Sequence, residues 1–75
     1  MRRTSGIIEQ YHPSKRWGYI RADDFERLFF HRGGILNAEA WTPRAGERVI
    51  FDRELGPKGP RAFHVHRTEA SGGTA

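Results

Sequence analysis

Turn-forming residues interrupt this chain at short intervals, and that spacing leaves room only for short strands. Clusters containing Gly, Pro, Asp or Ser occupy residues 12–14, 22–24, 32–34, 41–46 and 56–60. The segments between them are rich in β-branched and aromatic side chains and cover residues 5–11, 17–21, 27–31, 47–55 and 62–67. Short strands separated by frequent turns predict an all-β barrel or sandwich. No long helical period occurs, so we expect at most one helical turn, around residues 34–40.

The 75 residues are enough for one domain, and they contain no cysteine. The core of such a chain is small, and no disulfide can add to its stability. The apolar stretch that follows the basic start is only Ile7-Ile8, which is far too short for a signal peptide or a membrane span. These features favour a soluble, cytoplasmic protein that is stabilised by tight packing of Ile, Leu, Val and Phe.

The two-residue period of a strand assigns each side chain to one face. In the segment 27–31, Leu28 and Phe30 point to one side, whereas Phe29 and His31 point to the other. The same rule, applied to every segment, predicts a core of Ile8, Ile20, Leu28, Phe30, Ile35, Val49, Phe51, Phe63 and Val65. It leaves a second face with no obvious cover, formed by Trp17, Tyr19, Phe29 and His31.

The charge of the chain favours a polyanionic partner. Thirteen Lys and Arg residues against nine Asp and Glu residues give a formal net charge of +4 and a sequence pI of about 10.3. Cationic side chains displace the counterions condensed on phosphates, and aromatic rings stack on unpaired bases. An uncovered aromatic face on a basic domain therefore predicts binding to nucleic acid.

Four segments resemble the motifs of the cold-shock domain family. Residues 15–20 (KRWGYI) and 28–31 (LFFH) resemble its two ribonucleoprotein motifs, which usually read KGFGFI and VFVHF. Residues 6–8 (GII) are similar to its opening Gly-x-Val, and residues 58–62 (KGPRA) with Val65 are similar to its closing motif. The four segments keep the family's order over about residues 6–66, with nearly the same spacing.

The resemblance implies an all-β, five-stranded antiparallel OB-fold barrel that binds single-stranded RNA or DNA on its second and third strands. We expect this domain at residues 6–67, after a flexible segment 1–5 that includes the start of the first strand, and before a disordered tail at 68–75. The binding residues that it implies, with neighbouring candidates, are Lys15, Trp17, Tyr19, Phe29, His31, Arg32, Lys58, Tyr11, Arg16 and Trp41. The implied role is that of a nucleic-acid chaperone with low sequence specificity.

Three positions depart from the family pattern. Gln10 stands where the family has a tryptophan, Arg32 where it has a phenylalanine, and Arg16 where it has a glycine. Two stacking platforms are thereby lost and two cations are gained, so we expect weaker stacking and a larger electrostatic share of binding. Trp41, in the long connection, is a candidate replacement ring, with packing within that loop as the alternative.

Other classes of function remain open at this point. The aromatic face could dock a protein or a second copy of the chain, although we expect a monomer. A small ribonuclease built on His and Lys is a further alternative, but no catalytic triad or dyad stands out, and we expect no enzyme activity. His64 and His66 lie two residues apart in a strand segment without a characteristic ligand spacing, so we expect no metal and no small-molecule cofactor.

Overall fold

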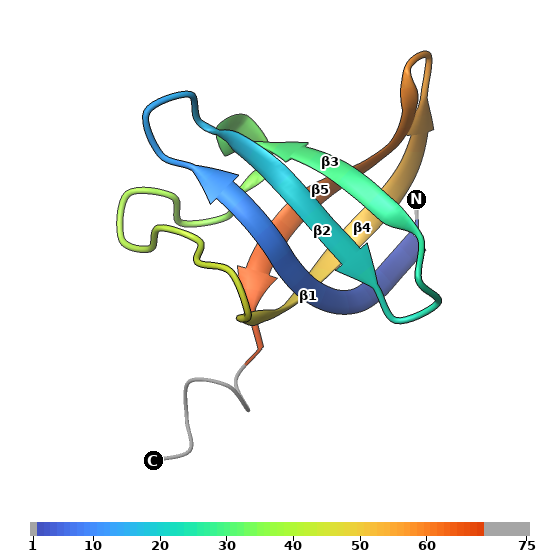
Figure 1. Cartoon of the computed structure of the whole chain (residues 1–75), viewed down its shortest axis with the longest axis horizontal. Helices are drawn as coiled ribbons and strands as arrows, with labels where there is room; N and C mark the ends of the chain where they lie inside the picture. The colour runs from blue at the N-terminus through green and yellow to red at the C-terminus, as the bar shows by residue number, and fades with distance from the viewer. Residues whose placement is uncertain (1, 69–75) are drawn as a thin grey trace.

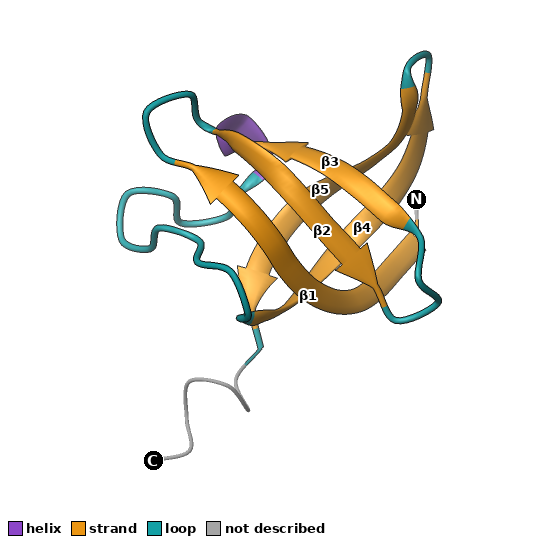
Figure 2. Ribbon diagram, in the orientation of Figure 1, coloured by secondary structure: helices purple, strands orange, loops and turns teal. Residues whose placement is uncertain are grey.

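Five strands form in the computed structural model, which describes residues 2–68 (Figure 1). They are β1 (Arg2–His12), β2 (Trp17–Ala22), β3 (Arg27–His31), β4 (Arg48–Gly56) and β5 (Gly59–Arg67). Within residues 2–68, one short 3-10 helix, η1 (Arg32–Gly34), directly follows β3, and Figure 2 draws it in purple. The predicted helical turn at 34–40 is therefore misplaced, because residues 36–40 form turns and the helical residues precede them.

The strands close into a barrel in the order β1-β2-β3-β5-β4, which confirms the OB-fold class but corrects the prediction of a purely antiparallel sheet. Four of the neighbouring pairs are antiparallel, and β3 pairs with β5 in parallel through Phe29 and Arg61. A closed ring with an odd number of strands cannot alternate in direction all the way around. At least one parallel pair is required, and here it lies between β3 and β5.

Strand β1 is longer than predicted because it serves two neighbours. Residues 2–7 pair with β4, and residues 6–12 pair with β2, so β1 curves across the barrel (Figure 1). Residues 2–5, which belong to the segment 1–5 expected to be flexible and to contain the start of the first strand, form part of β1. Between Ile8 and Gln10 the register with β2 shifts by one residue, and this bulge turns Tyr11 toward the inside and His12 toward the outside.

Eight of the nine predicted core residues are buried, Phe63 is the exception, and Ala22 and Ala62 join the core without having been predicted. The buried apolar side chains are Ile8, Ile20, Ala22, Leu28, Phe30, Ile35, Val49, Phe51, Ala62 and Val65. Phe63 is only half-buried, because a second bulge sets His64 and Val65 together opposite Phe51. His64 adopts a left-handed φ of 55° there, so Ala62 and Val65 both point inward and Phe63 points outward.

Gly18 sets the spacing between β1 and β2. A Cβ at this position would lie 2.1 Å from the carbonyl oxygen of Gln10 and 2.8 Å from the Cα of Tyr11. Both are backbone atoms, which cannot move without shifting β1. The glycine thus allows the close approach that holds Trp17 and Tyr19, its neighbours in β2, on the outer surface.

Among residues 2–68, no helix has the length and apolar character needed to cross a membrane. The predicted tail at 68–75 lies outside the described residues from residue 69 onward. The last described residue, Thr68, donates its backbone N–H to the carbonyl of Arg48 at 3.4 Å.

Candidate nucleic-acid interface

Three rings from β2 and β3 gather on the outer wall of the barrel, and we call Trp17, Tyr19 and Phe29 the aromatic face. Tyr19 and Phe29 are direct cross-strand partners, and their ring centroids lie 6.0 Å apart. Trp17 lies 5.6 Å from Tyr19 and 5.9 Å from Phe29. All three side chains remain partly exposed.

The predicted alternation of β2 and β3 is confirmed and explains why these rings point outward. Gly18 and Ile20 in β2, and Leu28 and Phe30 in β3, are buried. The intervening side chains must then lie on the other side of the sheet. The barrel core therefore fixes the orientation of the aromatic face.

The structure places the predicted cations and the predicted histidine around this face. Lys15 and Arg16 are exposed in the β1–β2 turn, and Arg32 is exposed in η1. His31 lies opposite Trp17 in the β2–β3 register. Its Nδ1 accepts the backbone N–H of Gly33 at 3.1 Å, which leaves Nε2 free to meet a ligand.

Lys58 lies in the hairpin between β4 and β5 and lines a groove next to the aromatic face. The hairpin of β4 and β5 closes through Gly56 and Gly59, so Pro57 and Lys58 form its tip. A groove of about 640 Å³ runs from Tyr19 and Phe29 to this hairpin, and its walls are Arg27, Pro57, Lys58, Pro60 and Arg61. The groove thus connects the aromatic face with the positive charges of Lys58 and Arg61.

Tyr11 and Trp41 are not part of the aromatic face. The Tyr11 ring stacks on the buried Phe30 ring, at 5.6 Å between centroids and 17° between planes. Trp41 packs against the core, and its indole N–H donates to Glu47 Oε1 at 3.1 Å. Both contacts give these rings a packing role, and for Trp41 this agrees with the loop-packing alternative.

Sequence reasoning missed three side chains that lie against the aromatic face. His12 is 4.7 Å from Trp17 between ring centroids. The guanidinium carbon of Arg27 lies 4.1 Å from the Tyr19 centroid, and that of Arg61 lies 5.4 Å from the Phe29 centroid. The bulge in β1 changes the face of His12, so its position could not be predicted from the two-residue period. The position of Arg27 on the same strand face as Phe29 could have been predicted, because the two residues are two positions apart.

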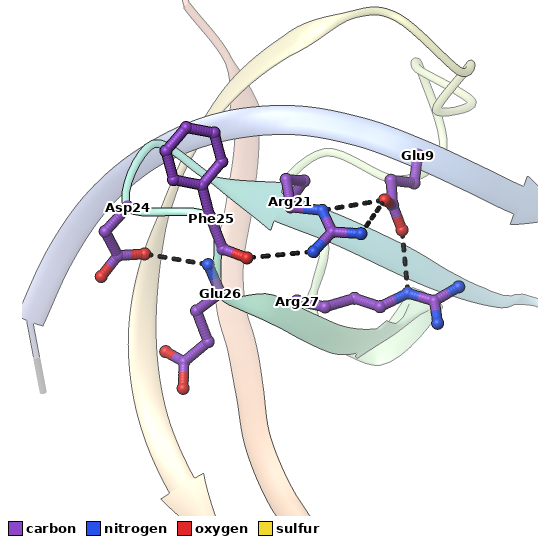
Figure 3. A network of polar contacts seen from close by, with 6 residues as sticks. All are labelled: Glu9, Arg21, Asp24, Phe25, Glu26 and Arg27. Carbon is purple, nitrogen blue, oxygen red and sulfur yellow. Dashed lines mark hydrogen bonds and ion pairs between the residues drawn. The ribbon is translucent and has the colours of Figure 1, made fainter.

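The Glu9 carboxylate holds both Arg21 and Arg27 (Figure 3). One carboxylate oxygen accepts from Arg21 Nε at 2.9 Å and Nη2 at 2.7 Å, and the other accepts from Arg27 Nε at 2.8 Å. These hydrogen bonds from Arg21, with the charges of both arginines, hold the pKa of the Glu9 carboxyl below its usual range. Arg27 is thus tethered across the Tyr19 ring by an ion pair.

The histidines of β5 do not form a shared cluster. His64 sits at the bulge, and its Nδ1 lies 2.7 Å from Asp52 Oδ2. The Nδ1 of His66 instead lies 2.9 Å from the carbonyl oxygen of His64. In the part of the chain that the structure describes, no three His, Cys, Asp or Glu side chains are grouped so as to hold a metal ion.

A closed five-stranded barrel whose β2 and β3 carry outward rings among cations defines an OB-fold domain with a candidate nucleic-acid interface. The chain belongs to the "Cold-shock" DNA-binding domain family, whose model matches residues 4–68. The family consists of nucleic-acid-binding domains rather than enzymes, so the chain is a nucleic-acid-binding protein of the cold-shock type.

Named relatives agree with this assignment. The chain is 34% identical over 62 residues to cold shock-like protein CspJ of Salmonella typhi, an alignment that covers 81% of this chain and 89% of that protein. Cold shock-like protein CspI of Escherichia coli K12 shows the same identity and coverage. Among solved structures, Drosophila Unr CSD456 superposes with a TM-score of 0.74 at 20% identity, over 89% of this chain and 27% of that one, which shows the shared fold.

Proposed function

We propose that the chain binds single-stranded RNA or DNA on the aromatic face with low sequence specificity and acts as a nucleic-acid chaperone. The observation that carries the proposal is the placement of Trp17, Tyr19 and Phe29, three partly exposed rings within 6.0 Å of one another. The exposed parts of these rings can stack on unpaired bases, and the Arg27 guanidinium beside Tyr19 can join the same stack. Bases in a duplex already stack on each other, so such a surface favours single strands.

Cations on both sides of the rings supply the second part of the binding energy. Lys15 and Arg16 lie beyond one end of the aromatic face, and Lys58 and Arg61 line the groove at the other. Each phosphate that they neutralise releases condensed counterions. Affinity should therefore fall with salt, with a slope of about −0.7 in log–log units for each phosphate contacted.

The chaperone role follows from mass action. A protein that binds only the open form of a hairpin shifts the equilibrium toward that form by an amount set by its concentration relative to Kd. Contacts through base faces rather than base edges let many sequences bind. No nucleotide hydrolysis is required for this activity.

The test is a titration of fluorescent oligonucleotides with the variants Phe29→Ala and Trp17→Ala. Loss of one stacked base lowers the binding free energy by about 1–3 kcal/mol, which weakens Kd by about 5- to 150-fold. Phe25→Ala is the matched control, because Phe25 is an aromatic residue in the β2–β3 turn with 80% exposure. It should bind like the parent.

Parent-like affinity in folded Phe29→Ala and Trp17→Ala would show that stacking on this face does not drive binding. Light scattering with and without oligonucleotide then measures the mass of the protein and of its complex. A monomer that gains the mass of the oligonucleotide supports the proposal. A stable dimer that does not bind oligonucleotide would instead indicate that the aromatic face is a protein-interaction surface. Cleavage of the RNA during incubation would indicate that the protein is a ribonuclease.

A further inference from the structure

Phe63 presents a fourth ring on the outer surface, beyond the aromatic face. The bulge at His64 turns it outward, and its side chain is partly exposed like those of Trp17, Tyr19 and Phe29. Its edge runs beside η1, since a Cβ at Gly34 would lie 3.6 Å from Phe63 Cδ1.

Arg61 connects Phe63 to the aromatic face. Its guanidinium carbon lies 5.4 Å from the Phe29 centroid and 5.8 Å from the Phe63 centroid. The two ring centroids are therefore at most about 11 Å apart, and the guanidinium lies within 6 Å of both. The parallel pairing of Phe29 with Arg61 fixes this arrangement in the backbone. A guanidinium can stack on a base and donate hydrogen bonds at the same time.

The surroundings of Phe63 favour a base over a phosphate. Its cross-strand partner on β4 is Asp52, and the partner of Arg61 is Glu54. Asp52 already pairs with His64. Carboxylates on this side repel a phosphate, whereas they leave the face of a neutral base unaffected. The path of a bound strand would thus keep its phosphates away from β4 and turn a base toward β5.

We infer that Arg61 and Phe63 form an additional base-binding subsite, which extends the aromatic face from β3 onto β5 and takes one further nucleobase of the bound strand. The inference rests on the proposed function, because the aromatic face must bind the same strand. Its expected consequence is a longer binding site than the aromatic face alone provides.

An abasic scan tests the subsite. Each position of a short oligothymidine is replaced in turn by an abasic nucleotide, and Kd is measured for the parent and for Phe63→Ala. The parent should lose affinity by about fivefold or more at each position whose base is stacked. In Phe63→Ala, removal of the base at one of these positions should no longer change Kd. At the positions bound by the aromatic face, removal of the base should weaken binding as it does in the parent.

Two further variants separate stacking from folding. Phe63→Leu keeps apolar bulk beside Gly34 but removes the flat ring. It should therefore fold normally, and its Kd should be insensitive to base removal at the same position as in Phe63→Ala. Phe29→Ala should remove a different position. If both Phe63 variants keep the parental abasic profile while Phe29→Ala changes it, the subsite is refuted and the proposed function stands. If the parent binds no oligonucleotide, the subsite and the proposed function fail together.

Discussion

Glu9 restrains two arginines at the edge of the aromatic face, so Glu9→Gln measures how much this restraint opposes binding. Arg21 and Arg27 pair with the Glu9 carboxylate at 2.7 and 2.8 Å, and both arginines are about half exposed. Exposed pairs of this kind contribute about 0.2–1 kcal/mol each. Their loss should destabilise the fold by about 0.4–2 kcal/mol in total.

The same substitution should strengthen binding to single-stranded nucleic acid. A phosphate must compete with Glu9 for Arg27, and removal of the carboxylate charge ends that competition. If the energy of the Arg27 pair is recovered in the complex, Kd falls by about 1.4- to 5-fold. Lower stability together with higher affinity is the expected signature, measured by thermal unfolding and by oligonucleotide titration at one salt concentration.

Asp24→Asn is the matched control for charge. Asp24 lies in the β2–β3 turn and pairs with Arg53 of β4 at 3.0 Å. This variant loses the same unit of charge and one ion pair, but it should bind nucleic acid almost like the parent. Equal gains in the two variants would mean that net charge alone acts, and unchanged affinity in Glu9→Gln would refute the competition for Arg27.

Three other substitutions or conditions give further expectations. Gly18→Ala should destabilise the fold by about 1–3 kcal/mol or more because its Cβ meets the β1 backbone, whereas Gly33→Ala, with only one contact at 3.7 Å, should be nearly neutral in the same denaturant titration. Arg16→Gly should raise the free energy of unfolding by up to about 1 kcal/mol, since Arg16 has a φ of 66°, while oligonucleotide affinity falls with the lost charge; a lower Tm would contradict this. Arginine contacts lower the folded-state pKa values of Glu9 and Asp24 below their ordinary values of 4.5 and 3.8. Because the unfolded state binds more protons in this range, the two carboxylates stabilise the fold above the ordinary pKa values, and this stabilisation is lost as pH falls below them. In an acid titration of Tm, a Glu9→Gln, Asp24→Asn double variant should lack this part of the loss.

The regular strands were the predictable part of this molecule. In β2 and β3 the two-residue period runs without interruption, so Trp17, Tyr19 and Phe29 were placed on the outer face from sequence alone. The odd number of strands in a closed ring requires at least one parallel pair, which strand count alone would have predicted, but the strand order is needed to place that pair between β3 and β5.

Bulges account for most of what sequence reasoning missed. One extra residue in β1 turned His12 to the outside, and one in β5 moved Phe63 out of the predicted core. A two-residue period cannot anticipate them, because a bulge depends on the partner strand as well as on its own sequence. The contacts of Arg27 and Arg61 with the rings depend in turn on cross-strand register, which becomes known only when the barrel is closed.

The partly exposed rings of the aromatic face should bind unpaired bases in preference to paired ones, and one titration tests this preference directly. A labelled oligonucleotide is offered as a single strand and as a duplex of the same length and sequence, at the same salt concentration. The single strand should bind at least about fivefold more tightly, the value of one stacked base at its lower limit. Equal or tighter binding to the duplex would contradict recognition through stacked bases and leave only attraction between phosphates and cations.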